Sequence, residues 1–262
     1  MVFSQEPREY KTQAVEWNCR MTETILGLII GAILFGVFER KHVRRLRDRS
    51  LEIRRRAVRA KAGRNLASAL DAAGFFNSLP ADAVRRVRAQ IEADGYAGVF
   101  SHPWRAVSAD DEELAEGHVG IFLQAVTPSL NRLGVSPLVG ESRFLDGGVH
   151  MLDLANETIT LVSVDEARED DRDGGKHFGF SWGAVGARVL ERLNMQIADA
   201  GGEDRFYSVY GGGNDAHALL LNPPMLAAIL SSPGIRPDEL PYIRTTEWPR
   251  FGMPRMPKIS TL

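Results

Sequence analysis

The most uniformly hydrophobic stretch of the chain lies near its N-terminus, in Met21–Phe38, where no polar residue occurs from Ile25 onward. A helix in the core of a globular domain usually keeps a polar stripe for solvent, and this segment has none. As a helix it would span roughly 27 Å, just enough to cross the hydrocarbon core of a bilayer. The pattern therefore predicts a transmembrane helix at 21–38, with the membrane anchor formed by Ile25, Leu26, Leu28, Ile29, Ile30, Ile33, Leu34, Phe35 and Phe38.

The segment that follows, 39–64, is strongly basic, with twelve Lys or Arg residues against three acidic ones. Dense positive charge just after an apolar helix holds that flank in the cytoplasm, so we expect the N-terminus outside and the C-terminal part inside. The segment has no Gly or Pro before Gly63, which favours a long basic helix. Its cations would contact anionic lipid headgroups or another polyanion, chiefly through Arg40, Lys41, Arg44, Arg45, Arg47, Arg54, Arg55 and Arg56.

Two other interpretations of the N-terminal region compete with a transmembrane helix. A cleaved signal peptide carries its positive charges before the apolar run, whereas here they follow it. If the apolar helix is instead buried in a fold, the basic helix would suit nonspecific binding of nucleic acid, and this alternative stays open. The start of translation is also open between Met1 and Met21, because 1–20 is a short polar segment without a motif.

Beyond residue 64, the spacing of apolar residues predicts a mostly helical segment followed by strands. Helical spacing bounded by Gly or Pro predicts helices over 65–73, 80–94 and 110–134. Asp146-Gly-Gly148 predicts a turn between two strands. The rest divides into strands at 143–145, 149–154, 158–164, 205–210 and 217–221, an exposed loop at 166–176, a helix at 182–200 and a short helix at 223–230.

This order of elements predicts an α+β fold, with an antiparallel sheet and helices packed on one of its faces. We expect one globular domain within the chain of 262 residues. The predicted organisation is a polar N-terminal segment at 1–20, a transmembrane helix at 21–38, a basic juxtamembrane helix at 39–64, an α+β domain at 65–232 and a Pro-rich tail at 233–262.

Composition changes this picture little. Apolar residues make up 44% and charged residues 25% of the chain, and the net charge is -2, all ordinary for a globular protein that buries a core. The net charge of the whole chain does not show the basic segment at 39–64, because acidic residues elsewhere in the chain balance it. A single cysteine, Cys19, excludes an internal disulfide and a cysteine-based metal site.

Three histidines follow Gly-rich turns and are the candidate catalytic residues. His150 and His177 each end a DGGxH sequence, and His217 follows Asp215 two residues earlier. Imidazole and carboxylate groups meeting at such turns could form a hydrolytic or metal site. Asp-Gly and Asn-Asp are, however, also the ordinary residues of turns, and no HxxxH pairing supports a metal site. We therefore predict no bound metal and no cofactor, and keep the hydrolase as an alternative.

Another formal match, Gly179-Phe-Ser181-Trp-Gly183, has the spacing of a nucleophile elbow. The elbow needs a hydrophobic strand before the serine, and the preceding residues are charged and rich in Gly. Ser181 is better explained as the cap of the helix that follows.

The C-terminal tail carries large apolar residues among prolines and could lie along another protein, with Trp248, Phe251 and Met253 as contact residues. Taken together, the patterns favour a binding domain rather than an enzyme. The predicted function is that of a single-pass membrane protein whose cytoplasmic domain binds a protein partner, as an accessory or regulatory subunit of a membrane assembly.

Overall fold

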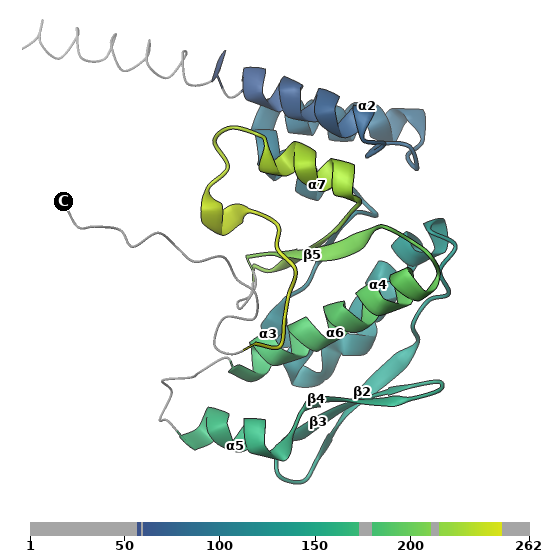
Figure 1. Ribbon diagram of the computed structural model, residues 1–262, viewed down its shortest axis with the longest axis vertical. Coiled ribbons are helices and arrows are strands. Elements are labelled where there is room, and N and C mark those ends of the chain that lie inside the picture. Colours follow the sequence, from purple (N-terminus) through teal and green to yellow (C-terminus); the bar gives the residue numbers. More distant parts are fainter. Residues whose placement is uncertain (1–56, 59, 173–179, 211–214, 248–262) are drawn as a thin grey trace, which may run out of the picture. The chain divides into compact units, whose positions relative to one another are not determined.

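The computed structural model describes residues 57–58, 60–172, 180–210 and 215–247 (Figure 1). Its contacts divide the chain into two units, Met1–Ala57 and Val58–Leu262. The sheets and helices that follow all belong to the second unit.

The first sheet, sheet A, is three-stranded and antiparallel. Its central strand is β6 (His217–Leu221), which pairs with β1 (Ala106–Ser108) on one side and β5 (Arg205–Val209) on the other. Residues 218–221 of β6, the run ALLL, are all buried. A continuous apolar run of this kind is expected of a strand that is covered on both faces.

Helices cover one face of sheet A, and Leu219 and Leu221 of β6 point toward them. These helices are residues 60–72, α2 (Ala81–Asp94), the 3-10 helix η1 (Gly95–Ser101) and α7 (Pro223–Leu230). α2 buries Ala83, Val87 and Ile91, which recur every four residues and form one helical stripe.

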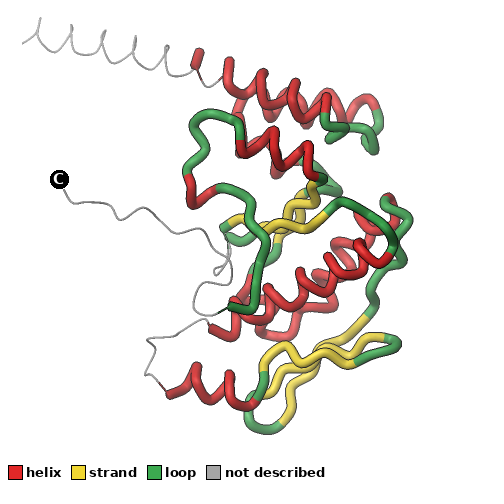
Figure 2. Tube along the Cα trace, in the orientation of Figure 1, coloured by secondary structure: helices red, strands yellow, loops and turns green. Residues whose placement is uncertain are grey.

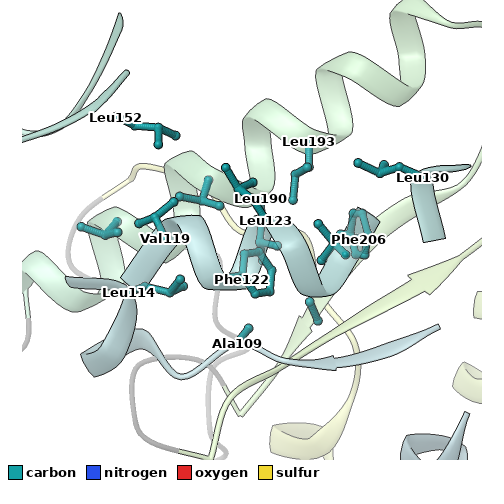
Figure 3. Close-up of a cluster of buried hydrophobic side chains, with 14 of the residues drawn as sticks. Ala109, Leu114, Val119, Phe122, Leu123, Leu130, Leu152, Leu190, Leu193 and Phe206 are labelled. Atoms are coloured by element: carbon teal, nitrogen blue, oxygen red, sulfur yellow. The ribbon is translucent and has the colours of Figure 1, made fainter. Parts of the chain in front are cut away.

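The opposite face of sheet A packs on α4 (Val119–Arg132) and α6 (Phe180–Asp199) through residues such as Phe206 and Leu220 (Figure 3). α4 follows a short helix, α3 (Asp111–Glu113), and a π-helical turn, η2 (Leu114–His118).

A second sheet, sheet B, packs on the same helices from their other side. It is a meander of β2 (Gly140–Leu145), β3 (Val149–Leu154) and β4 (Thr158–Val162). Its Leu152 and Leu161 join the core around α4 and α6. The layers, from end to end, are helices, sheet A, helices and sheet B (Figure 2). The remaining elements are α5 (Val164–Arg172) and a 3-10 turn, η3 (Pro237–Glu239).

The predicted α+β class is confirmed, but the chain forms two antiparallel sheets where one was expected. Helices also cover both faces of sheet A rather than one. The segment predicted as a loop at 166–176 begins as helix α5, since Ser163 and Glu166 cap each other's backbone.

The expectation of a single-pass transmembrane protein is corrected. In the part of the chain that the structure describes, no helix has the length and apolar character needed to cross a bilayer. The segment 21–38, with its anchor residues from Ile25 to Phe38, lies outside the described residues.

Candidate functional site

A pocket of about 590 Å³ opens where η1, the end of β5 and the loop after α7 meet the first described helix. η1 supplies Tyr96, the residue after β5 is Tyr210, and η3 supplies Glu239. The remaining walls are mostly small or apolar: Val58, Ala62, Ala93, Asp94, Gly95, Ala97, Ser232, Pro233, Gly234 and Ile235. We call this the tyrosine pocket.

Tyr96 is one of the residues that line this pocket, and its hydroxyl is buried without a hydrogen-bond partner in the described protein. Only 9% of the residue is exposed, and its ring packs edge-on against Phe100 with centroids 5.3 Å apart. Burial raises the pKa of Tyr96, and the neighbouring Tyr210 and Glu239 raise it further. A buried polar group that lacks a partner is costly, so such a group needs an explanation beyond folding.

Tyr210 has a left-handed backbone, with φ of 56°, the one non-glycine residue with positive φ in the described chain. That conformation costs of order 1–3 kcal/mol for a residue with a bulky side chain, and such strain is typical of functional positions. Burial raises the pKa of the Tyr210 phenol, and Glu239 adds to the effect. Both phenols therefore remain protonated at neutral pH and act as hydrogen-bonding groups.

The electrostatics of the tyrosine pocket are acidic. Among the residues that the structure describes, its lining includes the acidic residues Asp94 and Glu239 and no basic residue. Glu239 is paired at the rim with Arg236, Nε to Oε1 at 3.1 Å, but Arg236 is itself largely exposed and also binds Asp238. The pocket thus combines hydroxyl oxygens, negative charge and short apolar walls, which suits a cation on an aliphatic stem.

His217, one of the candidate catalytic residues, lies next to this pocket without lining it. Its ring is 4.9 Å from that of Phe100, which also packs near Tyr210. Burial lowers the pKa of His217, while Asp215 opposes that effect. Asp215 is exposed. β5 and β6 pair antiparallel, with Val209 opposite His217.

His150 lies elsewhere, on β3 of sheet B. The residue is 1% exposed, its ring stacks on Phe144 with centroids 4.3 Å apart, and neither ring nitrogen has a hydrogen-bond partner in the described chain. Burial lowers the pKa of His150 to about 4. His177 lies outside the described residues. His150 and His217 are thus placed in different sheets, and the described residues contain no group of three His, Cys, Asp or Glu side chains able to hold a metal.

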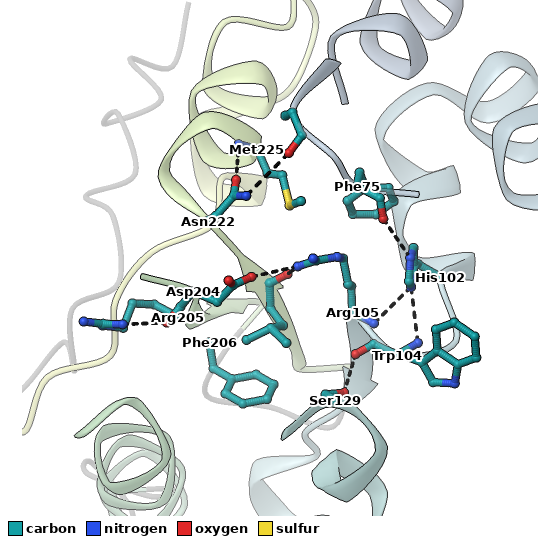
Figure 4. Close-up of polar contacts among 12 residues, drawn as sticks. Phe75, His102, Trp104, Arg105, Ser129, Asp204, Arg205, Phe206, Asn222 and Met225 are labelled. Carbon is teal, nitrogen blue, oxygen red and sulfur yellow. Dashed lines mark hydrogen bonds and ion pairs between the residues drawn. The ribbon is translucent and has the colours of Figure 1, made fainter. Parts of the chain in front are cut away.

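A histidine that sequence patterns did not single out, His102, is fully buried and structural (Figure 4). Its Nδ1 accepts hydrogen bonds from the backbone N–H groups of Trp104 and Arg105, at 3.2 and 3.1 Å. Nε2 therefore carries the proton and donates to the Phe75 carbonyl at 3.1 Å. Burial, reinforced by Arg105, lowers the pKa of His102 to about 4, which keeps the ring neutral. Nearby, Arg105 donates to Asp204 and to the Leu220 carbonyl, at 2.9 and 2.8 Å.

A buried ion pair between Arg244 and Asp111 also escaped prediction. Both side chains are 2% exposed, and Arg244 Nη1 lies 2.7 Å from Asp111 Oδ2. The second Arg244 nitrogen, Nη2, donates to the Gly183 carbonyl at 2.7 Å. The pair lies close to the backbone of α6 because Gly186 leaves room for it: a Cβ on Gly186 would lie 2.1 Å from Asp111 Oδ1. At this depth the pair is structural, and it fixes the segment after η3 to the rest of the fold.

The basic residues from Arg40 to Arg56 and the tail residues Trp248, Phe251 and Met253 lie outside the described part of the chain, so their contacts stay predictions. Ser181 lies in the first turn of α6, which begins at Phe180, rather than before the helix as its cap.

Comparisons with models of known families, with characterised proteins and with solved structures give no match for this chain.

Proposed function

We propose that this chain is a binding protein whose tyrosine pocket takes a cationic group, either the Lys or Arg side chain of a protein partner or a small primary amine. The observation that carries the proposal is that Tyr96 lines the pocket while its buried hydroxyl has no hydrogen-bond partner among the described residues. An ammonium or guanidinium group would donate to that oxygen and lie near Asp94 and Glu239. Its aliphatic stem would contact the Ala, Val, Pro and Ile side chains of the walls.

The chemistry of the pocket supports binding rather than catalysis. The raised pKa values of Tyr96 and Tyr210 leave both phenols protonated, so neither acts as a base near neutral pH. The hydrolase alternative relied on His150, His177 and His217 meeting at one place, and the two that are described lie in separate sheets.

Titration of the full chain with amine probes, followed by NMR and calorimetry, tests the proposal. The probes are the N-acetyl N-methylamides of lysine and arginine, which represent a partner's side chain, and putrescine, which represents a free amine. N-acetylnorleucine N-methylamide is the uncharged control. We expect the charged probes to bind and the norleucine probe not to bind, with an affinity that falls as salt increases.

The Tyr96→Phe variant separates a binding role from a structural one. We expect it to weaken binding of the cationic probe about tenfold, because it removes a hydrogen bond to a charged group. Its thermal stability should be at least that of the wild type, because no protein hydrogen bond is lost. Glu239→Gln should weaken binding by a similar factor and reduce its salt dependence.

Tyr207→Phe, which alters a phenol outside the pocket lining, is the matched control and should bind as the wild type does. Equal binding of norleucine and lysine probes, unchanged affinity in Tyr96→Phe, or no binding of any cationic probe would each refute the proposal. If only the amino-acid amides bind, the cationic group that the pocket takes is the side chain of a protein partner. If putrescine binds as tightly, that group is a free amine.

A further inference from the structure

Strand β2 forms one edge of sheet B and pairs only with β3 among the described strands. An unprotected edge strand exposes backbone donors and acceptors to any chain that can pair with it. β2 and the residue before it also expose large apolar side chains: Val139 is 76%, Phe144 54% and Leu145 45% exposed. This strand contains no proline, and its pairing with β3 runs without a bulge. Such an edge is expected to be covered.

The sequence of this edge, Val139-Gly-Glu-Ser-Arg-Phe-Leu145, is self-complementary about its central serine. If two copies of the strand pair antiparallel around a twofold axis at Ser142, each residue faces the one at the same distance on the other side. Glu141 then faces Arg143 of the second copy, and Val139 faces Leu145. Phe144 faces Gly140, which has no side chain. Opposite charges and apolar pairs placed directly across two strands stabilise a sheet.

The faces of the strand agree with this register. Glu141 and Arg143 lie on the face that also carries Asp153, which is paired with Arg143 and hydrogen-bonded to Thr158. Phe144 lies on the opposite face, where it stacks on His150. In the paired arrangement both charged pairs therefore lie on the polar face, and Phe144 of each copy lies on the face that packs against the helices.

The surroundings of Gly140 are apolar, because a Cβ on Gly140 would lie 2.6 Å from Leu154 Cδ2 and 3.3 Å from Leu152 Cδ1. α4 begins close to this end of β2, because a Cβ on Gly120 would lie 3.1 Å from the Gly140 carbonyl oxygen. The next residue of α4, Ile121, is exposed. A second copy's Phe144, placed opposite Gly140, would thus meet an apolar neighbour instead of solvent.

Other registers are less favourable. A twofold axis perpendicular to the sheet pairs residues that lie on the same face. It must therefore lie at a position where one residue faces the same residue of the second copy. Moving it to Arg143 would place two arginines opposite each other, and moving it to Glu141 would place two glutamates opposite each other. Like charges directly opposite are destabilising.

We propose that the occupant of this edge is a second copy of the chain, and that two β2 strands pair around Ser142 to join two copies of sheet B into one six-stranded sheet. Twofold symmetry makes each contact occur twice, which is the usual geometry of a homodimer. The proposal is independent of the tyrosine pocket, which lies on other elements.

The mass of the full chain in solution tests it, by sedimentation or light scattering. We expect the wild type at twice its chain mass of 29.0 kDa. Glu141→Arg places arginines opposite each other, and Arg143→Glu places glutamates opposite each other. Each single variant should raise the dimer dissociation constant roughly a hundredfold, because like-charge juxtaposition at an interface costs several kcal/mol. Arg85→Glu, on the exposed side of α2, is the charge-reversal control and should remain dimeric.

Mixing the two single variants gives the sharper result. Glu141→Arg presents two arginines and Arg143→Glu two glutamates, so each is self-repelling while the two are complementary. We expect the monomeric variants to form a one-to-one heterodimer when mixed. Circular dichroism establishes that each variant is folded. A monomeric wild type, a dimer that persists in both single variants, or a mixture that stays monomeric would each overturn the proposal.

Discussion

The imidazole of His150 is a single buried group that makes stability depend on pH. Burial lowers its pKa from the ordinary 6.5 to about 4 in the folded chain. Between those two values the unfolded chain binds a proton that the folded chain does not bind. Unfolding is therefore increasingly favoured as the pH falls through this window, by up to about 3 kcal/mol.

His150→Leu should remove this contribution. We expect the free energy of unfolding of the variant, relative to that of the wild type, to rise by up to about 3 kcal/mol as the pH falls from 7 to 4. Urea unfolding at several pH values measures the difference. His118→Leu, which replaces an exposed histidine, is the control and should follow the wild-type profile. A constant difference between His150→Leu and the wild type across the range would contradict this prediction.

The roles of several single residues could not be predicted from the sequence. The pairing of Asp111 with Arg244 joins positions far apart in the sequence, and no local spacing reveals it. No sequence pattern marks Tyr96 or Tyr210, because only the fold shows that the Tyr96 hydroxyl lacks a partner among the described residues and that Tyr210 has positive φ. The histidines stood out for their turn sequences, and the one before His150, Asp146-Gly-Gly148, forms a turn between β2 and β3.

At the level of helices and strands, local patterns were more informative. The hairpin around Asp146-Gly-Gly148, the strand at 217–221 and the short helix from Pro223 were all predicted and are confirmed. Helix α5 was missed although its start carries a capping box, Ser163-Val-Asp-Glu166. Arg188 further holds the pKa of Glu166 at about 2. The division into two sheets could not be predicted, because strand pairing depends on contacts that are distant in sequence.

Helix α6 gives a prediction at this scale. Replacing Gly by Ala within a helix normally stabilises it by up to about 1 kcal/mol. At Gly186 the added methyl would lie 2.1 Å from Asp111 Oδ1 and 3.1 Å from Arg244 Nη2. We therefore expect Gly186→Ala to lower the free energy of unfolding by about 2 kcal/mol or more, since it displaces one partner of a buried ion pair.

Chemical denaturation measures that loss. Met195→Ala, at an exposed position of the same helix, should change stability by no more than about 0.5 kcal/mol. Unchanged or increased stability of Gly186→Ala would show that the carboxylate of Asp111 can move without cost.

At the level of the whole molecule, sheet A connects two separate apolar clusters. Leu219 is buried in the cluster with α2 and α7, and its neighbour Leu220 in the cluster with α4 and α6. Because one strand supplies both, we expect neither cluster to unfold alone. Leu219→Ala and Leu220→Ala should each lower stability by about 2–5 kcal/mol while preserving one cooperative transition.

Unfolding of each variant is followed by far-ultraviolet circular dichroism and by tryptophan fluorescence. If unfolding is cooperative, the two signals change in the same transition. Leu230→Ala, at a half-exposed position of α7, is the matched control and should have little effect. Two separated transitions in either core variant would mean that the clusters are independent units.

The strap formed by residues 240–247 has a consequence for the order in which the protein is made. Tyr242 pairs with Ser208 beside β5, and Arg244 supplies the counter-charge for Asp111. Translation produces Asp111 long before Arg244, so a nascent chain that has already assembled both sheets would still lack the Arg244 guanidinium beside Asp111. Completion of the native fold must therefore wait until the strap has left the ribosome.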